Sequence, residues 1–136
     1  MAGPARLYAA VALGSALGSL ARFGVSLGAL AAFGPGFPFG TLAANVAGSW
    51  VIGLYAALSE PGGRLVASPA QRLFVLAGFC GGFTTFSIFS LETLRLAAAG
   101  AFGLAALNVA LSVALWLMAV WFGYRAGMRI NRLKGT

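Results

Sequence analysis

The chain has 136 residues, of which 60% are hydrophobic and 8% charged, and nine basic against two acidic side chains give a net charge of +7. A soluble domain carries roughly a quarter charged residues, so this composition excludes a soluble globular protein. It predicts one all-α membrane domain over residues 1–136. The charges flank hydrophobic segments, which favours lipid headgroups over nucleic acid as their partner.

Four apolar segments are long enough to cross a bilayer, which takes about 20 residues each. We expect transmembrane helices over residues 7–33, 39–58, 69–99 and 102–124. Ser68 and Pro69 have the residue types of an N-cap and a first helical position. The absence of histidine and the single Cys80 exclude an internal disulfide and a multi-cysteine metal site, and argue against acid–base catalysis by an enzyme.

The first segment carries a stripe with a four-residue repeat: Ala10, Gly14, Gly18 and Arg22. Small residues at this spacing predict close approach of a second helix. An arginine inside a membrane is costly and needs a partner or a wet cavity. Glu92 is the acid within a span, so an Arg22–Glu92 pair is one option, and Arg95, one turn from Glu92, competes for it.

The second segment places Thr41, Asn45 and Ser49 four residues apart on one face. Hydrogen bonds between helices are enough to explain the two hydroxyl groups on this face. The Asn45 amide needs several partners at bilayer depth, which favours a polar interior.

The third segment, taken as one helix, would be about 46 Å long, against a hydrocarbon core of roughly 30 Å. It contains Gly-Gly-Phe-Thr-Thr at residues 81–85, which continues a helix poorly. We therefore predict a break at residues 81–85 near the middle of the membrane. Such a break releases main-chain groups that only protein, water or an ion can satisfy.

After the predicted break, Phe86 and Phe89 share one helix face, and Ser87 and Ser90 share the next. Lipid-facing packing is one interpretation of the phenylalanines. Because ring edges carry partial positive charge, the alternative is a small anion between ring edges and hydroxyl donors. In the fourth segment, Asn108 and Ser112 lie four apart and extend the same polar interior.

An even number of spans places both termini on one side of the membrane. Basic residues collect on that side: Arg6, Arg64, Arg72, Arg125, Arg129, Arg132 and Lys134. The positive-inside rule therefore predicts that both termini are cytoplasmic.

The segment GGFTTFSIFS at residues 81–90 resembles the signature of the CrcB/Fluc family of fluoride channels. GSALGSLARFG, GTLAANVAGSWVIG and NVALSVALWLMAVWFG look like that family's first, second and fourth helices. The resemblance implies an antiparallel, dual-topology dimer with two fluoride pores and a structural sodium ion (Na+) at its centre.

By this resemblance, main-chain carbonyls of Gly81 and Thr84 hold the sodium. The fluoride pathway then takes the phenylalanine pair, the pore asparagine and hydroxyl groups: Phe86, Phe89, Asn45, Ser87, Ser90, Thr41 and Ser112, with Asn108 beside them. Two positions depart from the pattern, Ile88 where the family often has threonine and Asn108 where some members have tyrosine. The strong basic bias leaves two options, a homodimer in which the rule is weak or pairing with an oppositely biased paralogous subunit.

The resulting hypothesis is a passive, fluoride-selective channel, multi-pass in the plasma or inner membrane, that exports cytoplasmic fluoride. A small multidrug exporter is the main alternative, but such pumps need a carboxylate in the first helix, and the acids here are Glu60 and Glu92. A non-transporting structural subunit is a second alternative.

Overall fold

The computed structural model describes residues 3–132, and these are helical apart from short connections. The elements in chain order are α1 (Pro4–Phe33), α2 (Phe39–Leu58), α3 (Pro69–Arg72), the π-helix η1 (Leu73–Cys80), α4 (Gly81–Phe83), α5 (Phe86–Ala98) and α6 (Phe102–Arg132). Four helical stretches are long and apolar enough to span a membrane, with α3 to α5 forming the third. The prediction of an all-α membrane protein with four spanning helices is confirmed.

The helix ends follow from local sequence, with one difference from expectation. Ser68 Oγ accepts from the Gln71 N–H at 3.3 Å and Gln71 Oε1 accepts from the Ser68 N–H at 2.8 Å, which is a capping box. Gly34, at a φ of 72°, ends α1 before Pro35. Helix α6 continues to Arg132 instead of ending at residue 124, because charged residues end a membrane span without ending a helix.

Glycines bring the helix backbones into close contact in two pairs of neighbours. Helix α1 packs along η1 and α4, and α2 packs along α6. A Cβ at Gly14 would collide with the Phe74 carbonyl, and one at Gly18 with the Phe79 carbonyl. Gly53 on α2 and Gly123 on α6 meet the opposite helix in the same way. The predicted packing stripe on the first helix is therefore confirmed.

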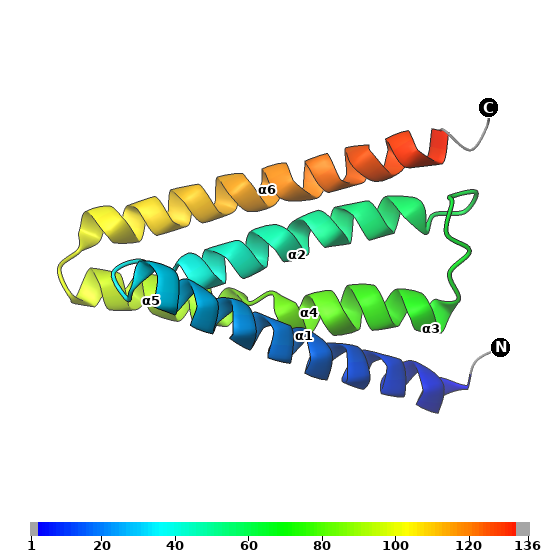
Figure 1. Ribbon diagram of the computed structural model, residues 1–136, viewed down its shortest axis with the longest axis horizontal. Helices are drawn as coiled ribbons and strands as arrows, with labels where there is room; N and C mark the ends of the chain where they lie inside the picture. The colour runs from blue at the N-terminus through cyan, green and yellow to red at the C-terminus, as the bar shows by residue number, and fades with distance from the viewer. Residues whose placement is uncertain (1–2, 133–136) are drawn as a thin grey trace.

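The third span changes its neighbours along its length. Its first part, η1 and α4, packs mainly on α1, whereas α5 packs on α6 and α2. Figure 1 shows α1 beginning and α6 ending at one end of the bundle, with the α1–α2 and α5–α6 turns at the other. The interruption between α4 and α5 thus separates two packing environments.

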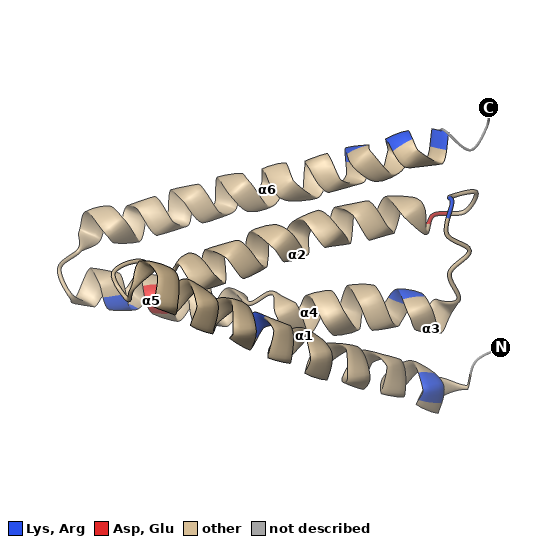
Figure 2. Cartoon of the chain, viewed as in Figure 1, with Lys and Arg blue, Asp and Glu red and all other residues tan. Residues whose placement is uncertain are grey.

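Most basic residues lie at the end of the bundle where α1 begins and α6 ends (Figure 2). The prediction that both termini are cytoplasmic rests on this distribution of basic residues. The orientation itself stays a prediction. Lys134, part of that prediction, lies outside the described residues.

Candidate functional site

The third span is interrupted at two residues, fewer than the five expected. Helix α4 ends at Phe83 and α5 begins at Phe86, while Thr84 (ψ 159°) and Thr85 (ψ 125°) are extended. Gly81 keeps helical angles, with φ of −63° and ψ of −37°. The expectation of unwinding from residue 81 is corrected, because the second glycine serves packing: a Cβ at Gly82 would collide with the Ser15 backbone.

Asn45 on α2 holds the extended main chain in place. The Thr85 N–H donates to Asn45 Oδ1 at 2.7 Å, and Asn45 Nδ2 donates to the Thr85 carbonyl at 2.9 Å. Asn45 is only 4% exposed, so this amide takes the place of the missing helical partners. In an unbroken helix the Thr85 N–H would donate to the Gly81 carbonyl, and the clamp frees that oxygen.

Thr85 also begins the next helix. Its Oγ1 accepts from the Ile88 N–H at 3.2 Å as the N-cap of α5. In an unbroken helix this N–H would donate to the Thr84 carbonyl. Gly81 and Thr84, the predicted sodium ligands, are therefore carbonyls whose usual helical donors are engaged elsewhere.

Side chains of α1 satisfy other carbonyls beside the interruption. Arg22 Nε donates to the Gly82 carbonyl at 3.2 Å, and Ser19 Oγ reaches the same oxygen at 3.4 Å. Ser15 Oγ donates to the Gly78 carbonyl at 3.4 Å. The half-buried Arg22 thus finds its partner at the carboxyl end of α4, where a cation is favourable, rather than in Glu92.

The two phenylalanines after the interruption lie together, as their spacing predicts. Their ring centroids are 5.5 Å apart, with 51° between the planes. Phe89 is 6% exposed and meets Trp116 of α6 edge-on at 4.9 Å, whereas Phe86 is 71% exposed. Sequence reasoning missed Trp116, although it continues the four-residue spacing of Asn108 and Ser112.

A hollow of about 210 Å³ opens beside the clamp. Its lining comes from α2, α6, the interruption and the start of α5, and consists of Asn45, Ser49, Ile52, Thr84, Thr85, Phe86 and Trp116. An asparagine amide has two N–H donors, and the clamp engages one of them, which leaves the second. The hollow therefore combines amide and hydroxyl donors with an aromatic ring.

The other predicted polar residues separate into two groups. Ser87 and Ser90 are exposed, and their hydroxyls contact Thr85 Oγ1 at 3.2 Å and the Phe86 carbonyl at 2.9 Å. Asn108 and Ser112 are 1% exposed.

The buried pair belongs to a continuous chain of hydrogen bonds. Ser112 Oγ donates to Asn108 Oδ1 at 3.4 Å, and Asn108 Nδ2 donates to Thr93 Oγ1 at 2.8 Å. The Thr93 hydroxyl donates in turn to the Phe89 carbonyl at 2.8 Å. Thr93 was missed, though Ser87, Ser90 and Thr93 recur every three residues.

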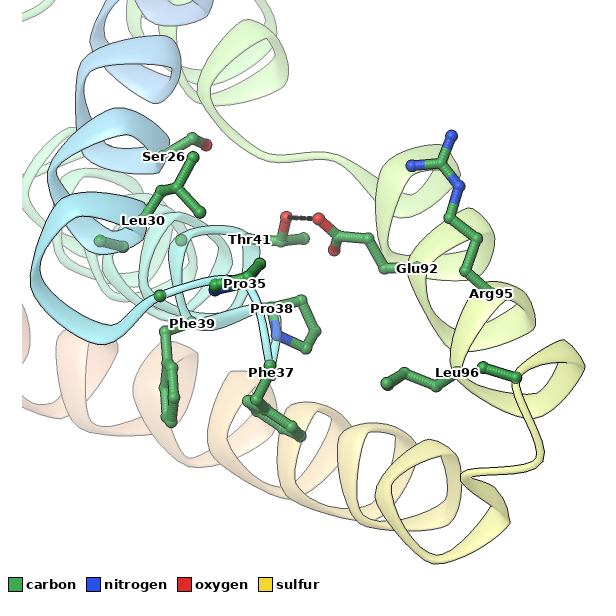
Figure 3. Close-up of a pocket in the computed structure, with 15 residues that line it drawn as sticks. Ser26, Leu30, Pro35, Phe37, Pro38, Phe39, Thr41, Glu92, Arg95 and Leu96 are labelled. Carbon is green, nitrogen blue, oxygen red and sulfur yellow. Dashed lines mark hydrogen bonds between the residues drawn. The ribbon is translucent and has the colours of Figure 1, made fainter.

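Thr41 and Glu92 meet away from the interruption. Thr41 Oγ1 donates to Glu92 Oε1 at 3.0 Å, and Glu92 Oε2, also buried, has no hydrogen-bond partner in the described part of the chain. Both residues line a hollow of about 470 Å³ between α5 and the α1–α2 turn, with Arg95 and Ser26 also in its wall (Figure 3).

Comparisons with known proteins cover nearly the whole chain. A family model described as CrcB-like protein, Camphor Resistance (CrcB), matches residues 9–124. The chain is 52% identical over 132 residues to Fluoride-specific ion channel FluC 1 of Rhodopseudomonas palustris (strain BisB18), covering 97% of this chain and 94% of the relative. It is 48% identical over 130 residues to Fluoride-specific ion channel FluC of Opitutus terrae, covering 96% and 98%.

Proposed function

Since the chain belongs to the CrcB-like protein family, we propose that it is a fluoride-selective ion channel through which cytoplasmic fluoride leaves passively. The names of its relatives support the transported ion. The observation that carries the proposal is structural: an interruption in a spanning helix, held open by Asn45, lies next to Phe86 and a donor-lined hollow. Its place is the plasma or inner membrane, as a multi-pass protein.

Fluoride is small and strongly hydrated, so a selective pathway must replace its water with close donors. The remaining Asn45 N–H and the Ser49 hydroxyl are donors in the wall of the hollow. Phe86 also lines the hollow, and the edge of its ring carries partial positive charge. In our proposal a dehydrated fluoride passes between these groups.

Phe89 has the second ring edge in this proposal, and its position depends on buried polar residues. The hydrogen-bond chain from Ser112 through Asn108 and Thr93 ends on the Phe89 carbonyl. These residues therefore tie the α5 backbone at Phe89 to α6. Ser87, Ser90 and Thr41 are proposed as hydroxyl donors along the rest of the route.

A structural sodium ion fits the main chain at the interruption. Gly81 and Thr84 have carbonyls whose usual helical donors are engaged by Asn45 and Thr85. Oxygen ligands of this kind suit a hard cation. When bound, sodium would supply positive potential and order the extended residues.

Two copies in opposite orientations would complete the site by bringing two such interruptions together. Phe86 is 71% exposed, and no described residue has an atom within 4 Å of a Cβ built at Gly81, so this side of the protomer has room for a partner. A paralogous subunit remains the alternative partner. Labelling of single cysteines from both sides of the membrane would support opposite orientations, and labelling from one side alone would contradict them.

Fluoride-electrode recordings of efflux from liposomes containing the purified protein test the function directly, with chloride efflux recorded in parallel. We expect fluoride efflux without chloride efflux and without dependence on a proton gradient. Equal flux of both ions, or none of either, contradicts the proposal. Proton-driven efflux of a cationic drug without fluoride flux would instead support the multidrug exporter.

A further inference from the structure

A third hollow lies toward the carboxyl end of α6, and its lining includes none of the residues of the proposed fluoride pathway. It has a volume of about 530 Å³. Trp50 contributes from α2, and the rest of the wall comes from α6, including Trp121, Phe122, Arg125, Arg129 and Ile130. Aromatic and aliphatic groups therefore border two cationic ones.

The length of α6 indicates the depth of this hollow. At 1.5 Å per residue its 31 residues extend about 46 Å, beyond a hydrocarbon core of roughly 30 Å. Counted from Phe102, Trp121 lies about 28 Å along the helix and Arg125 about 34 Å. With the hydrocarbon core beginning at Phe102, Trp121 would lie at its far edge, and Arg125 and Arg129 would lie at headgroup level.

The cationic side of the hollow is held in place, and the described residues that line it include no carboxylate. The Arg125 guanidinium lies over the Trp121 ring at 5.1 Å from its centroid. Arg129 follows one turn later, so both face the same hollow. The two acids of the chain, Glu60 and Glu92, are engaged by Tyr124 at 3.1 Å and Thr41 at 3.0 Å.

We propose that this hollow binds one anionic phospholipid, with its phosphodiester between Arg125 and Arg129 and an acyl chain along Trp50 and Phe122. Planar guanidinium groups match phosphate oxygens in pairs. A second copy of this chain fits the surface less well, because a protein of net charge +7 brings like charge to the arginines. The proposed site does not depend on fluoride conduction.

Quenching of tryptophan fluorescence by brominated lipids tests the site, because Trp50 and Trp121 line it and only Trp116 does not. The full chain is placed in phosphatidylcholine vesicles containing dibrominated phosphatidylglycerol or, in parallel, dibrominated phosphatidylcholine. We expect the anionic lipid to be preferred by about fivefold for each arginine. R125Q and R129Q should each lower that preference about fivefold, and together bring it near one.

Matched variants separate this site from general attraction to charge. R132Q removes the same charge from the same helix outside the hollow, and should leave most of the preference intact. R125K with R129K should retain part of it. Equal quenching by both lipids in the wild type, or an unchanged preference in a folded R125Q/R129Q variant, overturns the proposal. Displacement of the lipid by inorganic phosphate would also overturn the proposal. The same holds if neither lipid reaches the hollow because a second copy of the chain covers it.

Discussion

The two parts of the third span are held in opposite ways. Before the interruption, η1 and α4 pack on α1 through glycines, and backbone meets backbone. After it, α5 is attached to α6 by side chains, through the Asn108–Thr93 hydrogen bond and the Phe89–Trp116 contact. Backbone contacts tolerate no added atoms, whereas side-chain contacts set where a ring or a hydroxyl lies. We therefore expect changes in the first part mainly to lower the stability of the protein, and changes in the second part mainly to alter the geometry of the proposed pathway.

Added volume in the first part should have the largest effect. Gly18→Leu places atoms where the Phe79 carbonyl and the Phe83 backbone lie, and overpacking of this kind costs about 3 kcal/mol or more. We expect loss of monodisperse folded protein in size-exclusion chromatography. Gly28→Leu on the same helix is the control, since a Cβ at Gly28 would meet no atom of the described residues within 4 Å. Equal yields of the two variants would contradict the packing.

Removal of the clamp should have the next largest effect. Asn45→Ala leaves the Thr85 N–H and carbonyl without their partners, at about 1–3 kcal/mol for each buried group. We expect a marked drop in the thermal unfolding temperature. Ser49→Ala, one turn along α2, should unfold near the wild-type temperature. If Asn45→Ala unfolded at the wild-type temperature, the stabilising role of the Asn45 clamp would be contradicted.

Breaking the buried hydrogen-bond chain that holds the second part should cost less stability than removing the clamp. Asn108→Ala leaves the Thr93 and Ser112 hydroxyls without one partner, at about 1–2 kcal/mol. Because this chain ends on the Phe89 carbonyl, we expect fluoride efflux to fall in protein that remains folded. Val109→Ala, at an exposed neighbouring position, should leave efflux unchanged, and unchanged efflux in Asn108→Ala would contradict the positioning role.

Much of this comparison could be predicted from the sequence where the signal is local. The four spans, the Ser68 cap, the glycine stripe and the Phe86–Phe89 pair follow from periodicity and residue type. The extent of the interruption could not be predicted in this way, because Gly82 remains helical where it packs against Ser15 of a distant segment. The partners of Asn45, Arg22 and Asn108 come from other helices, which no single segment encodes.

Substitution of Arg22, which contacts the carboxyl end of α4, should have the smallest effect on stability. Arg22→Lys keeps the charge near the Gly82 carbonyl but loses the Nε donor. A charge-assisted bond that is only partly buried contributes about 1 kcal/mol. We expect a modest loss of stability in Arg22→Lys and a larger one in Arg22→Leu. Equal stability of all three proteins would indicate that the arginine has no structural role at the interruption.

In the proposed function, Asn45 holds the third span open so that fluoride can be dehydrated beside Phe86. Paired fluoride and chloride efflux from liposomes, compared for wild type, Asn45→Ala and Ser49→Ala at equal protein incorporation, tests it most directly. We expect fluoride-only efflux in the wild type, its loss in Asn45→Ala and a smaller reduction in Ser49→Ala. Full fluoride efflux in folded Asn45→Ala protein would contradict it.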